Sequence, residues 1–519
     1  MTHTTIPGPP VRSPGGLSRP GRNWLIGGAI GSAVTVGIAA AGYGPAALAV
    51  MLGGLLAVGL LAAVAYRPIL ATYLYLGTLP IIAGIDRGTL IPLVRPNEAL
   101  LVLLLAGAGI GGYLRYCRGD GVPVRPHPVD IPLAVFVVMG TVWPIASLML
   151  RGQAPAASDL AAVLPICKLV AIYLLIRFTV STEVQLVRCI RLIVWPGAVV
   201  AVIAILQTIG FGPVVAALES VWTPDVTSAA IAERGTTTLS SPIATGDYII
   251  FSLVLVICCA TRGVLDRRER LGLGLVLSAG VLASGQFSTW ISAAVAGVLI
   301  LWRFPELRRR AWRFLPMIPI VFAIGAPAVV SRLEGFSAQG VPPSWLGRWD
   351  NLSSFYLPRF DALHVLIGVS PNPVLPAPET WREVIYLEAG YLQFLWIGGI
   401  PLLLAFGWLS VAVLRNTAQH MGLPGALGAT ASALWIVWWF LLVLTVIDPH
   451  LTMRGIGDLL FVLMAITTGR LSVDRRSGPP PPGPMGIARP SHSRRHAGDD
   501  RPDSSGVADA GGGRGDPAG

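Results

Sequence analysis

Residues 425–447 read GALGATASALWIVWWFLLVLTVI, and no charged side chain occurs anywhere in this stretch. A helix of about 20 apolar residues is long enough to cross the hydrocarbon core of a bilayer, which is about 30 Å thick. The stretch therefore predicts a transmembrane helix.

Stretches of the same kind recur along the chain from Trp24 to Leu471. Of the 519 residues, 53% are hydrophobic and 13% are charged, whereas a soluble globular domain carries about 25% charged residues. This composition excludes a soluble multidomain enzyme and predicts an all-α fold, a polytopic membrane bundle of about fourteen (12–14) transmembrane helices. The predicted segments are 24–42, 45–65, 68–85, 98–114, 130–150, 160–177, 189–210, 247–261, 271–285, 288–302, 314–330, 389–413, 425–447 and 455–470.

The basic residues predict the orientation of these helices, because Lys and Arg concentrate in the short cytoplasmic loops of membrane proteins. Arginine-rich connections alternate with sparser ones and are assigned to the cytoplasm; they are 115–125, 177–191, 262–270 and 303–313. An even number of helices then places both termini in the cytoplasm. The predicted domains are a disordered cytoplasmic leader (1–22), a transmembrane domain (23–471) and a disordered cytoplasmic tail (472–519) rich in Pro, Gly and charge. We interpret 24–42 as a retained helix rather than a cleaved signal peptide.

Two predicted extracytoplasmic connections, about 211–246 and about 331–388, are too long to be simple turns. Long structured loops are where functional sites tend to lie. In the second loop, apolar residues recur at a spacing of three to four from Trp345 to Ile367, with Pro358 as an interruption. This spacing predicts short amphipathic helices at the membrane surface.

The first loop contains Arg234, a run of Thr and Ser residues, and Gly246-Asp247-Tyr248 where the next helix begins. An arginine and the backbone amides at a helix start together favour binding of a phosphate group. The alternative is an ordinary solvated loop with a turn at Ser241-Pro242.

In the second loop, arginines and carboxylates nearly balance, so surface ion pairs are an alternative to a binding site for each arginine. These residues are Arg332, Arg348, Arg359, Arg382, Glu334, Asp350, Asp361, Glu379, Glu383 and Glu388. Lys168 lies within a predicted helix, where a charge costs at least about 2.5 kcal/mol and is a functional candidate by default. Its alternative is that the amine extends to the interface.

Motifs for metal or nucleotide chemistry are not found. The sequence contains no Walker A loop, HExxH motif or CxxC pair. We therefore predict no metal and no cofactor, and the five cysteines predict no disulfide framework.

Taken in order, three segments resemble the O-antigen ligase and polymerase superfamily, whose members are integral membrane enzymes that move lipid-linked glycans. Arg234 to Tyr248 is similar to the family's arginine and polar run before a helix, although Ser241-Pro242-Ile243 stands where the family has Asn-Pro-Asn. Arg348-Trp349 followed by 366–371 (LIGVSP) is similar to its large-loop motif, and 388–401 (EAGYLQFLWIGGIP) to the segment that enters the next helix. The resemblance covers roughly residues 70–470.

This resemblance implies a GT-C-like, metal-independent membrane glycosyltransferase in a bacterial plasma membrane. It would transfer a glycan from a polyprenyl-diphosphate-linked oligosaccharide to a sugar hydroxyl of a glycan acceptor on the extracytoplasmic face. Ligases of the superfamily typically carry a histidine where this chain has Glu388-Ala389-Gly390-Tyr391, so the resemblance favours a polysaccharide polymerase. The implied partners are the donor, the acceptor, membrane lipid and a possible chain-length regulator, but no nucleic acid.

The implied catalytic residues are Glu388, which accepts the acceptor's proton, and Arg234 and Arg348, which hold the diphosphate. The implied substrate-binding residues are Arg359, Arg382, Tyr391, Trp349 and Lys168. Two other readings stay open: a transporter or flippase of the lipid-linked oligosaccharide, and a scaffold subunit of an envelope assembly machine.

Overall fold

The structure is a computed structural model that describes residues 51–86, 94–119, 126–224, 231, 234–310, 316–334, 343–377 and 383–472. The predicted leader, the first predicted helix (24–42) and the tail beyond Ser472 lie outside the described residues, as does Arg382. Everything below concerns the described part, which belongs to one unit of the chain.

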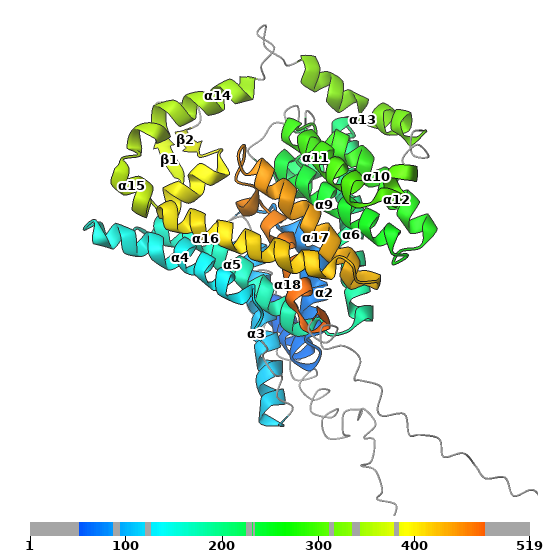
Figure 1. Ribbon diagram of the computed structural model, residues 1–519, viewed down its shortest axis with the longest axis horizontal. Helices are drawn as coiled ribbons and strands as arrows, with labels where there is room; N and C mark the ends of the chain where they lie inside the picture. Colours follow the sequence, from blue (N-terminus) through cyan, green and yellow to red (C-terminus); the bar gives the residue numbers. More distant parts are fainter. Residues whose placement is uncertain are drawn as a thin grey trace, which may run out of the picture. The chain divides into compact units, whose positions relative to one another are not determined.

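Helices dominate this part of the chain (Figure 1). They are Met51–Tyr66, α2 (Ile69–Ile82), α3 (Pro96–Cys117), α4 (Asp130–Leu150), α5 (Ala157–Thr179), α6 (Glu183–Thr208), α7 (Gly212–Val221), α9 (Pro242–Thr261), α10 (Arg267–Ala283), α11 (Phe287–Arg303), α12 (Pro305–Arg310), α13 (Met317–Glu334), α14 (Pro343–Asn351), α15 (Ala362–Ile367), α16 (Gly390–His420), α17 (Gly425–Leu444) and α18 (Ile456–Thr468). Short 3-10 or π turns are η1 (Thr237–Leu239), η3 (Leu352–Tyr356), η4 (Leu357–Arg359) and η5 (His450–Thr452). The strands are β1 (Val374–Ala377) and β2 (Glu383–Tyr386).

The prediction of an all-α membrane protein is confirmed. Each predicted apolar segment from 45–65 onward coincides with a helix, because a long uncharged run must satisfy its own backbone hydrogen bonds in lipid. In the described residues, 7 helices are long and apolar enough to cross a membrane: α3, α4, α5, α6, α9, α16 and α17. The other predicted segments among the described residues form shorter helices, so about fourteen crossings stay a prediction.

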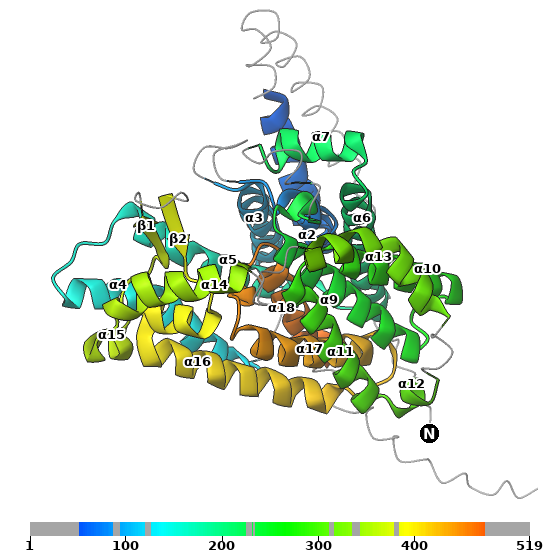
Figure 2. The ribbon, with the colours of Figure 1, turned by 90° about the horizontal axis from the view of Figure 1, so that it is seen from above.

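The centre of the bundle is formed by α9, α17 and α18, which are buried along most or all of their lengths (Figure 2). The other helices surround these three, and α3 is largely exposed on its outer face. In a membrane protein, exposed apolar side chains of this kind face lipid rather than water. The buried centre is therefore where polar groups need partners within the protein.

One end of the bundle gathers the connections that the arginine pattern assigns to the extracytoplasmic side. Arg454 after η5 lies 2.6 Å from Asp86 after α2, and Arg151 after α4 donates to the carbonyl of Val369 at 2.8 Å. Trp222 at the end of α7 donates to the carbonyl of Ile81 at 2.8 Å. Connections far apart in the sequence thus meet at one end.

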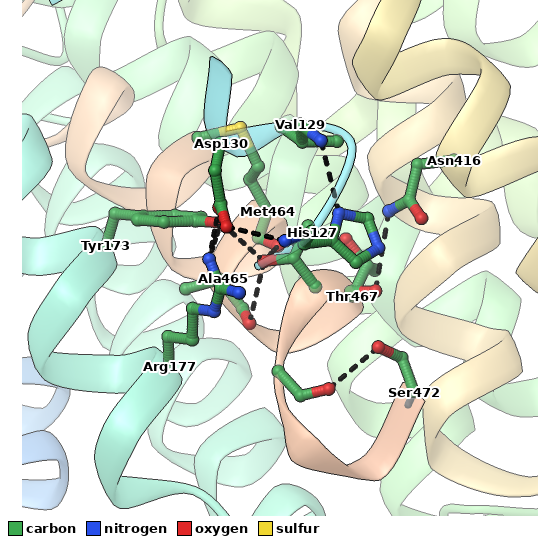
Figure 3. Close-up of polar contacts among 12 residues, drawn as sticks. His127, Val129, Asp130, Tyr173, Arg177, Asn416, Met464, Ala465, Thr467 and Ser472 are labelled. Carbon is green, nitrogen blue, oxygen red and sulfur yellow. Dashed lines mark hydrogen bonds and ion pairs between the residues drawn. The ribbon is translucent and has the colours of Figure 1, made fainter. Parts of the chain in front are cut away.

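The opposite end gathers the connections predicted to be cytoplasmic. Figure 3 shows Asp130 at the start of α4 accepting from Tyr173 (2.9 Å) and Arg177 of α5 and from the amide of His127 (2.7 Å). Glu183 at the start of α6 likewise accepts from the amide of Ala426 at 2.7 Å. Loops predicted to lie on the same side of the membrane thus meet at the same end of the bundle. Which end faces the cytoplasm stays a prediction.

The long loop after α13 folds into α14, η3, η4, α15 and an antiparallel hairpin in which Val374 faces Tyr386. The short helices were predicted from the apolar spacing, and the hairpin was not. Figures 1 and 2 both place α14, α15 and the two strands beside the first half of α16. The loop is therefore a folded unit rather than an open connection.

A break in α16 fixes this loop to the bundle. Gly399 has φ +66°, and a Cβ there would lie 2.4 Å from the carbonyl oxygen of Leu366. Pro401 follows, so α16 loses regular hydrogen bonds at this point. The carbonyl of Trp396 instead accepts from the amides of Val369 (2.6 Å) and Ser370 (3.1 Å). Loop and helix are thus joined by backbone hydrogen bonds.

Candidate functional site

An arginine between two carboxylates forms the centre of the candidate site. Nε of Arg348, on α14, lies 2.7 Å from Oε2 of Glu388, and its Nη2 lies 3.0 Å from Oδ1 of Asp448. The Asp448 side chain is 1% exposed and that of Glu388 is 31% exposed. The guanidinium therefore joins a buried carboxylate to one that solvent can reach.

The local sequence explains why Glu388 and Asp448 meet. Glu388 lies between β2 and α16, and Asp448 lies after α17, before Pro449. A Cβ on Gly390 would lie within 3.0 Å of the carbonyl oxygens of both Thr445 and Asp448, so glycine permits this close approach. Tyr391 reinforces the contact, because its amide donates to Thr445 O (3.2 Å) and its hydroxyl to Leu442 O (2.7 Å).

A buried histidine extends the cluster inward. His450, the first residue of η5, donates its amide to the Asp448 carbonyl at 2.9 Å. Its Nδ1 lies 2.5 Å from Oδ2 of Asp247 in the second turn of α9, and both side chains are 1% exposed. A Cβ on Gly246 would overlap Thr289, so this glycine allows α11 to approach the start of α9. We call Glu388, Arg348, Asp448, His450 and Asp247 the ion-pair network.

Burial and charge shift the pKa values of this network. Burial raises the pKa of Asp448 above its ordinary value, although Arg348 and His450 act in the opposite direction. Burial alone would lower the pKa of His450, but the carboxylates of Asp247 and Asp448 together more than offset it, so that pKa is raised. The network is thus a set of groups whose protonation states depend on one another.

A cavity of about 420 Å³ lies beside the network. Arg348 and Glu388 line it together with aromatic residues of the loop: Trp345, Trp349, Tyr356 and Tyr386. This volume falls in the range of about 300–1,000 Å³ that is usual for small-molecule sites. Trp349 and Tyr386 are 66% and 57% exposed, so their rings are open to a ligand. The cavity combines aromatic faces with one reachable carboxylate.

The structure brings together some of the predicted site residues. Arg348, Glu388 and Trp349 line one cavity, and Tyr391 supports its wall through the hydrogen bonds above. Arg359 is exposed and donates to the carbonyl of Phe355 in its own turn. Arg382 lies outside the described residues.

The other two predicted residues, Arg234 and Lys168, take part in different contacts. Arg234 precedes η1, and its carbonyl accepts from Nε2 of Gln207 at 2.7 Å. Among the described residues no contact joins Arg234 to Arg348 or Glu388. Lys168, on α5, lies 2.7 Å from Asp458 of α18, which also accepts from the hydroxyl of Tyr75 at 3.0 Å. Within the bundle Lys168 is thus paired rather than free to bind a substrate.

Sequence reasoning assigned no role to Asp448 or His450, and it named Asp247 only as part of the polar stretch that leads into α9. The sequence did contain an indication of a site, because Asp448-Pro449-His450 lies between two apolar segments. Ionisable residues beside transmembrane segments are expensive to bury and are functional candidates. Their partners are far away in the sequence, so the pairing itself could not be read from the chain.

The arrangement can accept a proton at Glu388, whose carboxylate is oriented by Arg348 and reaches the cavity. Among the described residues no three His, Cys, Asp or Glu side chains are grouped as a metal site would require. In comparisons with known proteins, the chain matches no protein-family model and no curated protein.

Proposed function

We propose that the protein is a membrane glycosyltransferase that moves a glycan from a polyprenyl-diphosphate carrier to a sugar hydroxyl. The observation that carries the proposal is the contact between Glu388 and Arg348 at the wall of an aromatic cavity, in the loop predicted to be extracytoplasmic. The family resemblance of the same residues supports it.

Glu388 is the general base in this proposal. The acceptor hydroxyl oxygen attacks the anomeric carbon, and its proton passes to the carboxylate of Glu388. The bond from that carbon to the diphosphate breaks, and polyprenyl diphosphate leaves with the electron pair. A positioned base of this kind contributes about 10²–10⁴-fold to a rate. The 2.7 Å contact with Arg348 would hold one carboxylate oxygen and leave the other for the proton.

Arg348 orients this base rather than acting alone on the diphosphate. Its guanidinium already faces Glu388 and Asp448, so its charge is compensated. We therefore propose that other arginines of the two loops bind the leaving diphosphate: Arg234, Arg359 and Arg382. Charge-assisted hydrogen bonds from these side chains would stabilise the departing group without a metal.

The aromatic side chains would hold the sugars. Trp345 and Trp349 are exposed on α14 beside the cavity, and the apolar faces of a sugar can pack on such rings. The hydroxyl of Tyr356 lies 2.7 Å and 2.9 Å from the carbonyls of Pro373 and Ile385, so it holds the hairpin rather than a ligand.

The test is the fate of a labelled polyprenyl-diphosphate oligosaccharide in liposomes that contain the purified protein, without nucleotide sugar or added metal. Longer glycan with release of polyprenyl diphosphate supports a polymerase. Transfer to a different lipid or glycan supports a ligase. If the label is exchanged between leaflets without new bonds, the glycosyltransferase proposal is wrong.

One observation favours a transporter as the second candidate. Lys168, Asp458 and Tyr75 form a buried polar contact inside the bundle, and intramembrane ion pairs often mark a transport path. This contact is fully paired in the structure, which fits a stabilising role equally well. The leaflet-exchange measurement decides between the two functions.

A further inference from the structure

The charges of the ion-pair network do not balance with arginine alone. Glu388, Asp448 and Asp247 are three carboxylates, and Arg348 is the one guanidinium that contacts any of them in the described residues. Asp247 and Asp448 are each 1% exposed, so solvent does little to stabilise their charges. A buried carboxylate without a cation is strongly destabilising.

Within the described residues, no other cation contacts this network. Lys168 is already held by Asp458 at 2.7 Å, and Arg454 by Asp86 at 2.6 Å. The charged groups that act on His450 are Asp247 of α9, Asp448 after α17 and Arg348 of α14, and Glu388 before α16 contacts the same arginine. Carboxylates outnumber free cations among them, which favours a charged imidazole.

Among the described residues, the imidazole of His450 has one hydrogen-bond partner. Nδ1 of His450 contacts Asp247, and Nε2 has no hydrogen-bond partner among the described residues. Asp247 therefore sets the orientation of the ring. The hydrogen bond from the amide of His450 to the carbonyl of Asp448 keeps His450 next to the carboxylate that Arg348 contacts.

We propose that His450 is a positioning residue that acts as an imidazolium: it supplies the second positive charge for Asp247 and Asp448 and so keeps Arg348 on Glu388. When the imidazole is neutral, Arg348 is the sole cation for all three carboxylates and is drawn toward the buried pair. Glu388 then loses the contact that orients it. The consequence for catalysis rests on the proposed function; the charge of His450 does not.

The first test is the pH dependence of thermal stability of the purified full-length protein in detergent. The pKa of His450 is raised in the folded protein, so its contribution to stability is complete below the unfolded value, near 6.5. That contribution is lost as pH rises through the folded pKa. At pH 6 we expect His450→Gln to lower Tm by about 2 °C, and this difference should shrink as the pH is raised to 9.

The matched control is His364→Gln. His364, on α15, also contacts an aspartate, with Nδ1 3.0 Å from Oδ1 of Asp361, but here the side chains are 27% and 64% exposed rather than 1%. Exposed pairs contribute little, so this variant should follow the wild-type curve at every pH. Asp247→Asn provides a second variant, which should flatten the pH dependence as His450→Gln does. If the difference in Tm between wild type and His450→Gln stayed constant from pH 6 to 9, the proposal that His450 is an imidazolium would be wrong.

The second test is the glycosyl-transfer assay across the same pH range. We expect His450→Gln to lower kcat about tenfold with little change in KM for the donor, and to remove the decline of wild-type kcat at high pH. If wild type transfers glycan and His450→Gln keeps its pH profile, the positioning role is wrong and the proposed function stands. If wild type transfers nothing, the proposed function fails, and the stability curves still decide the charge of His450.

Discussion

The carboxylate of Glu388 is the group on which the proposed chemistry depends most directly. Glu388→Gln keeps the size of the side chain but removes its capacity to accept a proton, so we expect transfer to fall by about 10²–10⁴-fold. The labelled-oligosaccharide assay measures this. Asp350→Asn is the control, because Asp350 is an exposed carboxylate on α14 that accepts a hydrogen bond from the hydroxyl of Ser354 at 3.4 Å. A Gln variant with the wild-type rate would rule out Glu388 as the base.

Arg348 also contributes to stability, because it neutralises the buried Asp448. Arg348→Ala removes the guanidinium that contacts this buried carboxylate and should lower the free energy of unfolding by about 3–5 kcal/mol. The double variant Arg348→Met/Asp448→Leu should recover most of this loss but no activity. Thermal melting in detergent gives the comparison, with Arg359→Ala as the exposed control, for which a change within about 0.5 kcal/mol is expected. If Arg348→Ala and Arg359→Ala had the same Tm, Asp448 would not be charged in the folded protein.

Among the individual residues of the ion-pair network, the sequence predicted two, Arg348 and Glu388, through motifs that lie near one another in the chain. It missed the contribution of Asp448, His450 and Asp247. Whether a carboxylate is buried and which cation it meets are decided by packing between α9, α14 and α17, and this packing is not encoded at a fixed spacing. The structure supplies these partners.

Among the elements, α16 depends on a single backbone conformation. Gly399 has φ +66° and ψ −161°, a region that is essentially restricted to glycine. Gly399→Ala should therefore destabilise the protein by about 1–3 kcal/mol from the backbone alone, with a further loss from the clash at Leu366 O. We expect faster tryptic cleavage after the exposed Arg359, because α15 would no longer pack on α16.

Gly407→Ala is the matched control in the same helix. A Cβ at Gly407 would meet no atom within 4 Å among the described residues. Alanine is favoured over glycine inside a helix by about 1 kcal/mol, so this variant should be neutral or more stable. Equal cleavage of the two variants would show that the break at Gly399 does not hold the loop.

The helices were predictable and the hairpin was not, for a physical reason. An apolar run of helical length has few alternatives in lipid, so composition alone determines its structure. Each strand has only four residues, and β1 contains Pro376, which cannot donate to a ladder. The hairpin is stabilised instead by contacts outside it, such as the hydroxyl of Tyr356. Such contacts cannot be recognised from a local pattern.

For the whole molecule, the arrangement of the connections makes a prediction about topology. Ser354, after α14, is exposed at one end, and Cys117, at the end of α3, is exposed toward the other. With the predicted orientation, Ser354→Cys should react with a membrane-impermeant maleimide in intact cells, whereas Cys117 should react only after permeabilisation. Wild type and a Cys117→Ser variant serve as controls. The reverse pattern would invert the topology, and equal reactivity would contradict the two-ended arrangement.

The alternation of the loops was predictable because the distribution of arginine is a property of the whole chain. The choice of which loops touch was not, since contacts such as Arg151 with Val369 join residues that share no motif. The overall arrangement therefore follows from composition, and the site follows from tertiary packing.

The break at Gly399 also limits how the loop can move. The carbonyl of Trp396 that the break releases from regular helix bonding is the acceptor for Val369 and Ser370, and the indole of Trp396 donates to Asn372 at 3.1 Å. Lifting the loop would leave backbone groups unpaired near the bilayer, at several kcal/mol each. Amide hydrogen exchange at Val369 and Ser370 should therefore be as slow as in the helix itself. In the proposed function, a glycan would therefore enter and leave past the exposed rings of α14, because the hairpin side of the loop is held in place.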